Sequence, residues 1–142
     1  MSLDLDEVRK RKKLADYYYD NYVKHYQKGD LSKASEFLWG SINNLTYCMG
    51  LLDNQRLSTH DKIRGHLQTL AATRQDKEIS DGLVVAETIH SNFFHNFMSK
   101  DVFDHQRKIV EGLVEKLGMI LLQRLEPQGI TNQNATPKDN TQ

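Results

Sequence analysis

The two prolines of the chain, Pro127 and Pro137, both lie close to its C-terminus. The 126 residues that precede them therefore lack the residue that interrupts helices most strongly. No stretch alternates apolar and polar residues between turn-forming residues, so the sequence predicts no strand. These two observations favour an all-α fold.

Apolar residues recur at helical spacing in five segments of the chain. Gly29 ends the first segment, and Asp30 and Ser99 are suited to cap the second and the fifth. Either Ser58 or Thr59 is suited to cap the third. The expected helices span about residues 3–27, 31–52, 59–74, 79–98 and 100–125.

The short connections between these segments predict that consecutive helices pack antiparallel. The expected fold is an all-α, antiparallel up-and-down helical bundle of about five helices, formed as one domain by residues 1–125. Residues 126–142 are polar and nearly free of large apolar side chains, so we expect a disordered tail.

The overall composition excludes several classes of protein. The chain has 19 lysine and arginine residues in total and 19 aspartate and glutamate residues in total, so its net charge provides no general attraction to nucleic acid. No apolar run approaches the ~18 residues that span a bilayer, and the N-terminus lacks the core of a signal peptide. One cysteine, Cys48, cannot form an intrachain disulfide. We therefore expect a cytoplasmic protein without membrane contact, with Cys48 as an inert buried thiol.

His90 is the most informative residue of the fourth segment. It projects onto the same helical face as four apolar residues, Leu83, Ala86, Phe93 and Phe97. Phe94 lies beside this face. Burying an imidazole costs free energy unless it finds a hydrogen-bond partner. We expect His90 to be mostly buried and neutral near pH 7, with Glu87 able to oppose that tendency.

His60 is the best candidate for a partner of His90. It lies at the start of the third segment and projects inward with Ile63 and Leu67. His60 and His90 are the candidate catalytic residues, and the same pair is equally consistent with a satisfied polar core.

A metal site is not expected. His90 and His95 are five positions apart, which places them about 140° apart on a helix, whereas the members of a two-histidine metal pair are four positions apart. No glycine-rich phosphate loop or nucleophile motif occurs either, so no cofactor is predicted.

The basic run from Arg9 to Lys13 has two interpretations. Five cations in a row can bind phosphate, but they also suit a solvated helix face. The tyrosines that follow, Tyr18, Tyr22 and Tyr26, have helical spacing, which favours core packing over stacking on bases.

Four segments resemble the archaeal PaREP-type helical proteins. The resemblance covers about residues 10–120 in the order of that family. It is carried by residues 29–36 with Trp39-Gly40, by Ser58-Thr59-His60-Asp61, by residues 86–94 (Ala-Glu-Thr-Ile-His-Ser-Asn-Phe-Phe), and by residues 110–117.

The resemblance extends to the wider HEPN superfamily of helical bundles. That superfamily contains metal-independent ribonucleases, toxins paired with minimal nucleotidyltransferases, and inactive binding modules. Its active ribonucleases carry an arginine, then about four to six residues, then a histidine on one helix. No arginine lies at that distance before His90 or His95.

The resemblance therefore implies a binding or regulatory module in an RNA- or nucleotide-linked toxin–antitoxin or defence system. It also implies a homodimer, with RNA, a nucleotide or a nucleotidyltransferase as partner. The candidate binding residues are Asn92, His95 and Trp39. Two alternatives stay open: a metal-independent endoribonuclease using His90, and a structural dimeric interaction protein, which an exposed patch centred on Trp39 would favour.

Overall fold

The structure is a computed structural model that describes residues 4–126. It contains five helices: α1 (Leu5–Gln27), α2 (Leu31–Leu52), α3 (His60–Arg74), α4 (Lys77–His95) and α5 (Lys100–Leu125). The described residues form no strand, so the prediction of an all-α helical bundle is confirmed. The predicted tail lies outside the described residues, apart from Glu126.

Side-chain caps set the start of each helix. Asp30, Thr59 and Ser99 each accept a hydrogen bond from a backbone N–H in the first turn that follows. Such a bond satisfies one of the donors that a helix start leaves without a partner. The caps predicted for the second and fifth helices are confirmed, and the third is capped by Thr59 rather than Ser58.

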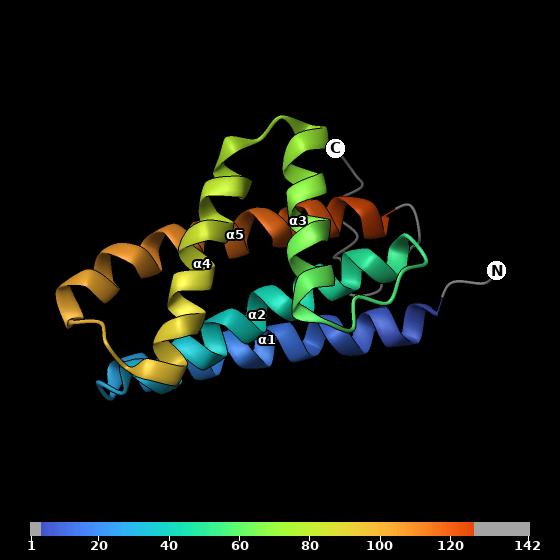
Figure 1. Cartoon of the computed structure of the whole chain (residues 1–142). Coiled ribbons are helices and arrows are strands. Elements are labelled where there is room, and N and C mark those ends of the chain that lie inside the picture. The colour runs from blue at the N-terminus through green and yellow to red at the C-terminus, as the bar shows by residue number, and fades with distance from the viewer. Residues whose placement is uncertain (1–3, 127–142) are drawn as a thin grey trace, which may run out of the picture.

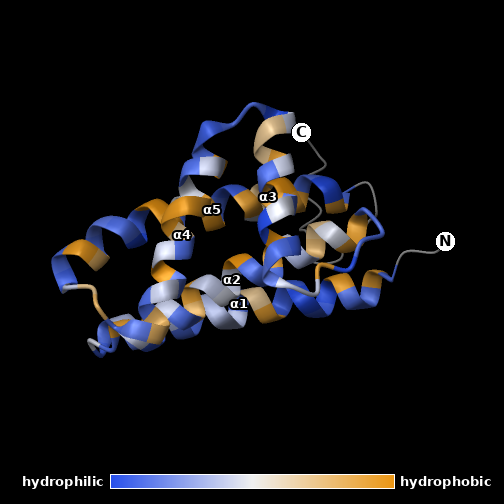
Figure 2. Cartoon of the chain, in the orientation of Figure 1, coloured by the Kyte–Doolittle hydropathy of each residue, from blue (hydrophilic) through white to orange (hydrophobic). Residues whose placement is uncertain are grey.

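Helix α2 lies at the centre of the fold. It packs against all four of the other helices, and most of its residues from Ala34 to Leu51 are buried. Figure 1 shows α1 and α2 side by side, with α5 running along them and the α3–α4 hairpin crossing them steeply. Hydrophobic and hydrophilic residues alternate along each helix (Figure 2), as expected for helices that bury one face.

Helix α4 ends one turn earlier than the sequence predicted. Asn96 adopts a left-handed conformation with φ of 46°, which terminates the helix. The Oδ1 atom of Asn92 then accepts hydrogen bonds from the backbone N–H groups of Phe97 and Met98, both at 2.8 Å. The prediction that the helix continues to Met98 is wrong because the Asn92 side chain accepts hydrogen bonds from the backbone N–H groups of the turn that follows.

The buried face of α4 is correspondingly rotated from the predicted one. Leu83 and Ala86 are buried as expected. Phe97, however, lies outside the helix and is 57% exposed, and Phe94 is 65% exposed. His90 is half-buried at the edge of the face, which is formed by Ile79, Gly82, Leu83, Ala86, Ile89 and Asn92.

Tyrosines of α1 connect this helix to α5. The hydroxyl of the buried Tyr22 donates to Glu111, and that of Tyr26 donates to Asp104. The guanidinium of Arg107 lies 3.9 Å from the centre of the Tyr26 ring and donates to Glu111. These contacts give Tyr22 and Tyr26 the structural role that their spacing favoured.

Cys48 is fully buried, and burial raises the pKa of its thiol to about 12, so it has the character of an inert thiol. Within residues 4–126, none of the helices combines the length and the apolar character needed to cross a bilayer.

Candidate ligand-binding cleft

The two histidines singled out from the sequence lie next to each other. His60 is the first residue of α3, and His90 lies in the last two turns of α4. Their ring centroids are 5.5 Å apart, and they lie 5.0 Å (His60) and 4.7 Å (His90) from the ring centroid of Trp39. Helix α3 thus places His60 in contact with Trp39 of α2.

The three rings are nearly parallel, with interplanar angles of 23°, 7° and 17°. Two rings stacked on opposite faces of a third would lie about 7 Å apart, twice the contact distance of ~3.5 Å. The separation of 5.5 Å between the imidazoles is shorter than that. Both imidazoles therefore lie on the same face of Trp39.

Glu87 fixes the orientation of His60. Its Oε2 atom lies 3.0 Å from Nε2 of His60 and accepts a hydrogen bond of 2.7 Å from Nε of Arg64. Because an ionised carboxylate only accepts, Nε2 of His60 carries a hydrogen and donates it. Glu87 thus joins α4 to two successive turns of α3 and leaves Nδ1 of His60 for another partner.

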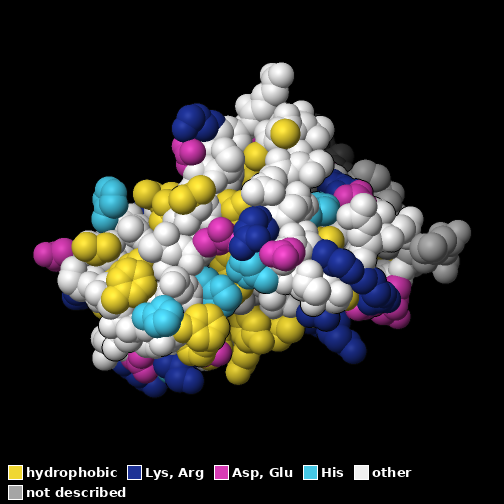
Figure 3. Space-filling view, viewed as in Figure 1, with side chains coloured by type: hydrophobic (Ala, Val, Ile, Leu, Met, Phe, Trp, Pro, Cys, Tyr) yellow, Lys and Arg dark blue, Asp and Glu magenta, His cyan; other side chains and the backbone are white. Residues whose placement is uncertain are grey.

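A cleft of about 400 Å³ opens beside these rings. It is formed by α1, α2, α4 and the segment leading into α3, and its lining is Arg11, Trp39, Asn43, Tyr47, Leu57, Ser58, Thr59, His60 and His90. In Figure 3, histidine, acidic and basic side chains gather next to hydrophobic ones on the face over α3 and α4. The cleft therefore combines aromatic surface, hydroxyl and amide groups, and positive charge.

Arg11 provides the positive charge from α1. Its guanidinium lies 4.0 Å from the centre of the Tyr47 ring and donates to Oδ1 of Asn44 at 3.2 Å. Within the described part of the chain, it forms no ion pair, whereas Arg9 pairs with Asp6 and Lys12 with Asp16. The basic run predicted to bind phosphate or to form a solvated face thus contributes one arginine to the cleft.

The environment of His90 favours its neutral form. Burial lowers the pKa of the imidazole below its ordinary value, and the neighbouring His60 lowers it further. Glu87 opposes this shift, as its position in the sequence suggested, but is the smallest of the three causes. Near neutral pH, His90 is therefore an imidazole with a free acceptor nitrogen, suited to accept a hydrogen bond or a proton.

The candidate binding residues have different environments. Trp39 is 7% exposed and forms one wall of the cleft, so no exposed patch is centred on it. His95 is exposed at the end of α4 and does not line the cleft. Asn92 is fully buried, and besides its bonds to the turn its Nδ2 donates to Oγ of Ser35 at 3.0 Å. These bonds give Asn92 a structural role and leave no side-chain surface for a ligand.

The sequence placed Glu87 next to His90 without pairing it with His60, and it singled out neither Arg11 nor Arg64 as part of this site. Glu87 precedes His90 by one helical turn, which is a signal that it can lie near the same cleft. Nothing in the sequence indicates that Arg11 lies opposite, because that contact depends on how α1 packs on α2. The described residues contain no group of three or more histidine, cysteine or acidic side chains suited to hold a metal ion.

Fold and cleft together define a small all-α bundle with an open, partly aromatic and partly cationic cleft. The model of the archaeal PaREP1/PaREP8 family matches residues 10–114, which is more than half of the chain. The chain belongs to this family. No curated protein and no solved structure matches it.

Proposed function

We propose that this chain is a binding module that holds a nucleotide or a segment of RNA in the Trp39–His60–His90 cleft and serves a regulatory role in a toxin–antitoxin or defence system. The binding proposal rests on two features of one cleft: a platform of stacked rings, and an arginine, Arg11, that forms no ion pair within residues 4–126. Planar rings stack on nucleobases, and a guanidinium binds phosphate in a planar, bidentate geometry. The regulatory setting comes from the HEPN-like resemblance of the sequence.

A fluorescence titration tests the binding proposal directly. Trp39 is the single tryptophan of the chain, so a nucleotide entering the cleft changes the only indole signal. We expect saturable quenching by ribonucleotides, weakened in His90→Ala and in Arg11→Gln. The matched control is His105→Ala, which removes an exposed histidine of α5. Absence of saturable binding by any of the four ribonucleoside monophosphates or by short RNA would refute this function.

A second candidate is a metal-independent endoribonuclease, favoured by the contact between His60 and His90. In that reaction, neutral His90 takes the proton of a ribose 2′-hydroxyl, which then attacks the adjacent phosphorus. A protonated His60 gives a proton to the departing 5′-oxygen, and Arg11 stabilises the negative charge that develops on the phosphoryl oxygens. The products are a 2′,3′-cyclic phosphate and a 5′-hydroxyl end, so the step needs no metal and no further reactant.

RNA cleavage in EDTA separates the two candidates. A ribonuclease cleaves RNA in the wild type and loses cleavage in His90→Ala, while the melting curve stays intact and His105→Ala stays active. A binding module binds RNA without cleaving it in either protein. Both measurements are made on the same preparations, so loss of structure in the variant is recognised by its melting curve.

A further inference from the structure

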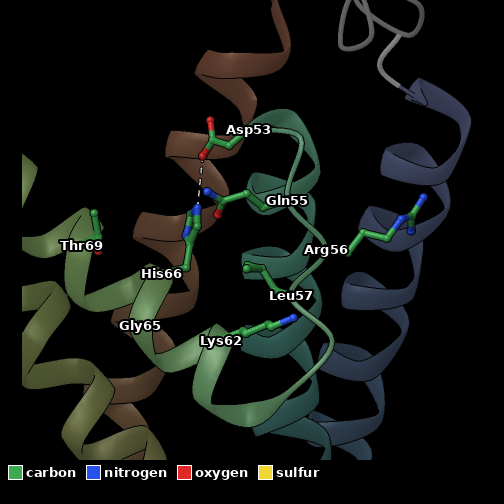
Figure 4. Close-up of a pocket in the computed structure, with 8 residues that line it drawn as sticks. All are labelled: Asp53, Gln55, Arg56, Leu57, Lys62, Gly65, His66 and Thr69. Carbon is green, nitrogen blue, oxygen red and sulfur yellow. Dashed lines mark hydrogen bonds and ion pairs between the residues drawn. The ribbon is translucent and has the colours of Figure 1, made fainter. Parts of the chain in front are cut away.

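A second hollow of about 580 Å³ lies beside the cleft. Leu57 lines both, so they adjoin along one side of the molecule. The hollow lies between α3 and the segment that joins α2 to α3 (Figure 4), and its lining is Asp53, Gln55, Arg56, Leu57, Lys62, Gly65, His66 and Thr69. Each space falls within the range of about 300–1,000 Å³ that is typical of small-molecule pockets.

Most charges around the second hollow are already paired. Asp53 accepts from Arg124 at 2.7 Å and lies 3.2 Å from Nε2 of His66. Arg56 points away from the hollow in Figure 4 and forms two hydrogen bonds of 2.9 Å with Glu7 of α1. Within residues 4–126, Lys62 forms no ion pair. The hollow therefore offers one uncommitted ammonium group.

The other side of Arg11 carries mixed charge. Arg11 also lines a third hollow together with Asp4, Asp6, Glu7 and Lys10, where Asp6 pairs with Arg9 and Glu7 with Arg56. In the hollow beyond Leu57, the one acidic side chain, Asp53, is paired with Arg124, and Lys62 has no ion pair among the described residues. A negatively charged chain that starts at Arg11 therefore meets the more favourable charge past Leu57, toward Lys62.

We infer that the ligand of the cleft is an oligoribonucleotide that occupies both spaces, with at least two consecutive nucleotides bound. This inference rests on the proposed function. The first nucleotide places its base against the rings of His60 and His90 and its phosphate at Arg11. The second lies beside Leu57 and Gly65, and its phosphate contacts Lys62. Asn43 and Ser58, which line the cleft, offer an amide and a hydroxyl to the ribose 2′-hydroxyl.

Gly65 allows the second space to be blocked without touching the first. A Cβ atom at this helical position meets no atom within 4 Å, so a side chain added there extends into the hollow. Replacing a helical glycine also favours the helix. Gly65→Met is therefore expected to fold and to fill the second space. Gly112→Met is the matched control, because Gly112 of α5 is equally open and lies outside both spaces.

The test measures Trp39 fluorescence with adenosine and uridine monophosphates and with the tetranucleotides of the same bases. We expect the wild type to bind one tetranucleotide about tenfold more tightly than its monophosphate, since the phosphate contact with Lys62 and the base beside Leu57 are absent from the monophosphate complex. Gly65→Met reduces the tetranucleotide affinity to that of the monophosphate, and Gly112→Met does not. Lys62→Gln lowers the slope of log affinity against log salt by about 0.7, the value for one phosphate contact of a single strand, whereas Lys108→Gln leaves it unchanged.

The outcomes separate this inference from the function on which it rests. Equal affinity for the two ligands, or a tetranucleotide advantage that survives in a folded Gly65→Met protein, overturns the inference and leaves the function standing. Loss of monophosphate binding in that variant also overturns it, because the spaces are then not separate.

Equal binding of the deoxyribose tetranucleotide overturns the assignment to RNA. If neither ligand binds the wild type, the function itself is refuted. If Gly65→Met does not fold by circular dichroism, the salt slope of Lys62→Gln decides.

Discussion

The imidazole of His90 lies parallel to the indole of Trp39, with ring centroids 4.7 Å apart and ring planes 7° apart. A titratable group is thereby in contact with the single tryptophan of the chain. Since a protonated imidazole quenches the fluorescence of an indole that it touches, Trp39 reports the ionisation of the candidate site without an added label.

The first prediction concerns the pH dependence of that signal. Burial and the nearby His60 lower the pKa of His90 from its ordinary value of 6.5. The emission of Trp39 should therefore fall along a transition with its midpoint below 6.5. His90→Gln should remove this transition and leave only the contribution of His60, the other imidazole in contact with Trp39. His105→Gln should titrate like the wild type. A wild-type midpoint above 6.5 would contradict the burial assigned to His90.

The second prediction concerns stability, for which the same shift has a definite sign. Well above pH 6.5, His90 is neutral in both the folded and the unfolded chain and has no effect on the pH dependence. As the pH falls below 6.5, the unfolded chain binds a proton that the folded chain still excludes, so the free energy of unfolding decreases until the lowered pKa is reached. Chemical denaturation between pH 7 and 5 should show a smaller loss in His90→Gln than in the wild type.

Helical periodicity predicted the helices because each buries one face against α2. It also predicted that His60 and His90 point toward the interior. It failed at the end of α4, where the apolar spacing of Phe93 and Phe97 suggests a continuing helix. The hydrogen bonds of Asn92 to the following backbone outweigh that pattern, and Phe97 leaves the helix face.

The composition of the cleft was only partly predictable. His60 and His90 were singled out because they combine titratable chemistry with inward positions, and Trp39 because it lies in a segment that carries the family resemblance. Arg11 belongs to a run of five basic residues, and sequence spacing alone does not tell which of them faces α2. The pair that Arg64 forms with Glu87 likewise depends on the packing of α3 on α4, which local sequence does not determine.

The third prediction tests the structural role of Asn92. Asn92→Ala removes the acceptor of two backbone N–H groups and the donor to Ser35 inside the protein. We expect a decrease of about 1–3 kcal/mol in the free energy of unfolding, the cost of buried groups that lose their partners. Ser91→Ala, at the exposed neighbouring position, is the control. If Asn92 instead served only a ligand, the alanine variant would be as stable as the wild type.

The fourth prediction compares two helical glycines. A Cβ atom at Gly82 would lie 3.1 Å from Cβ of Leu113, where α4 crosses α5, whereas a Cβ atom at Gly112 meets nothing within 4 Å. Gly82→Ala should therefore lower the free energy of unfolding, because the crossing must widen. Gly112→Ala should raise it by about 0.5–1 kcal/mol, the advantage of alanine over glycine in a helix. Urea denaturation of both variants measures these changes. Equal changes in the free energy of unfolding would contradict the close approach of α4 and α5 at Gly82.

The fifth prediction concerns the homodimer expected from the sequence resemblance. Phe94 and Phe97 are 65% and 57% exposed, and the ring of Phe94 contacts that of His90. Large exposed aromatic side chains are typical of protein interfaces, and the equal numbers of acidic and basic residues leave no net charge to keep two copies apart. We expect the wild type to sediment as a dimer, and the double variant Phe94→Ser, Phe97→Ser to sediment as a monomer with an unchanged helical circular dichroism spectrum. Met119→Ser, which alters a side chain of α5 that is also 57% exposed, should remain dimeric. A monomeric wild type at high concentration, or a dimer that survives in the double variant, would remove these two aromatic residues from any interface between copies.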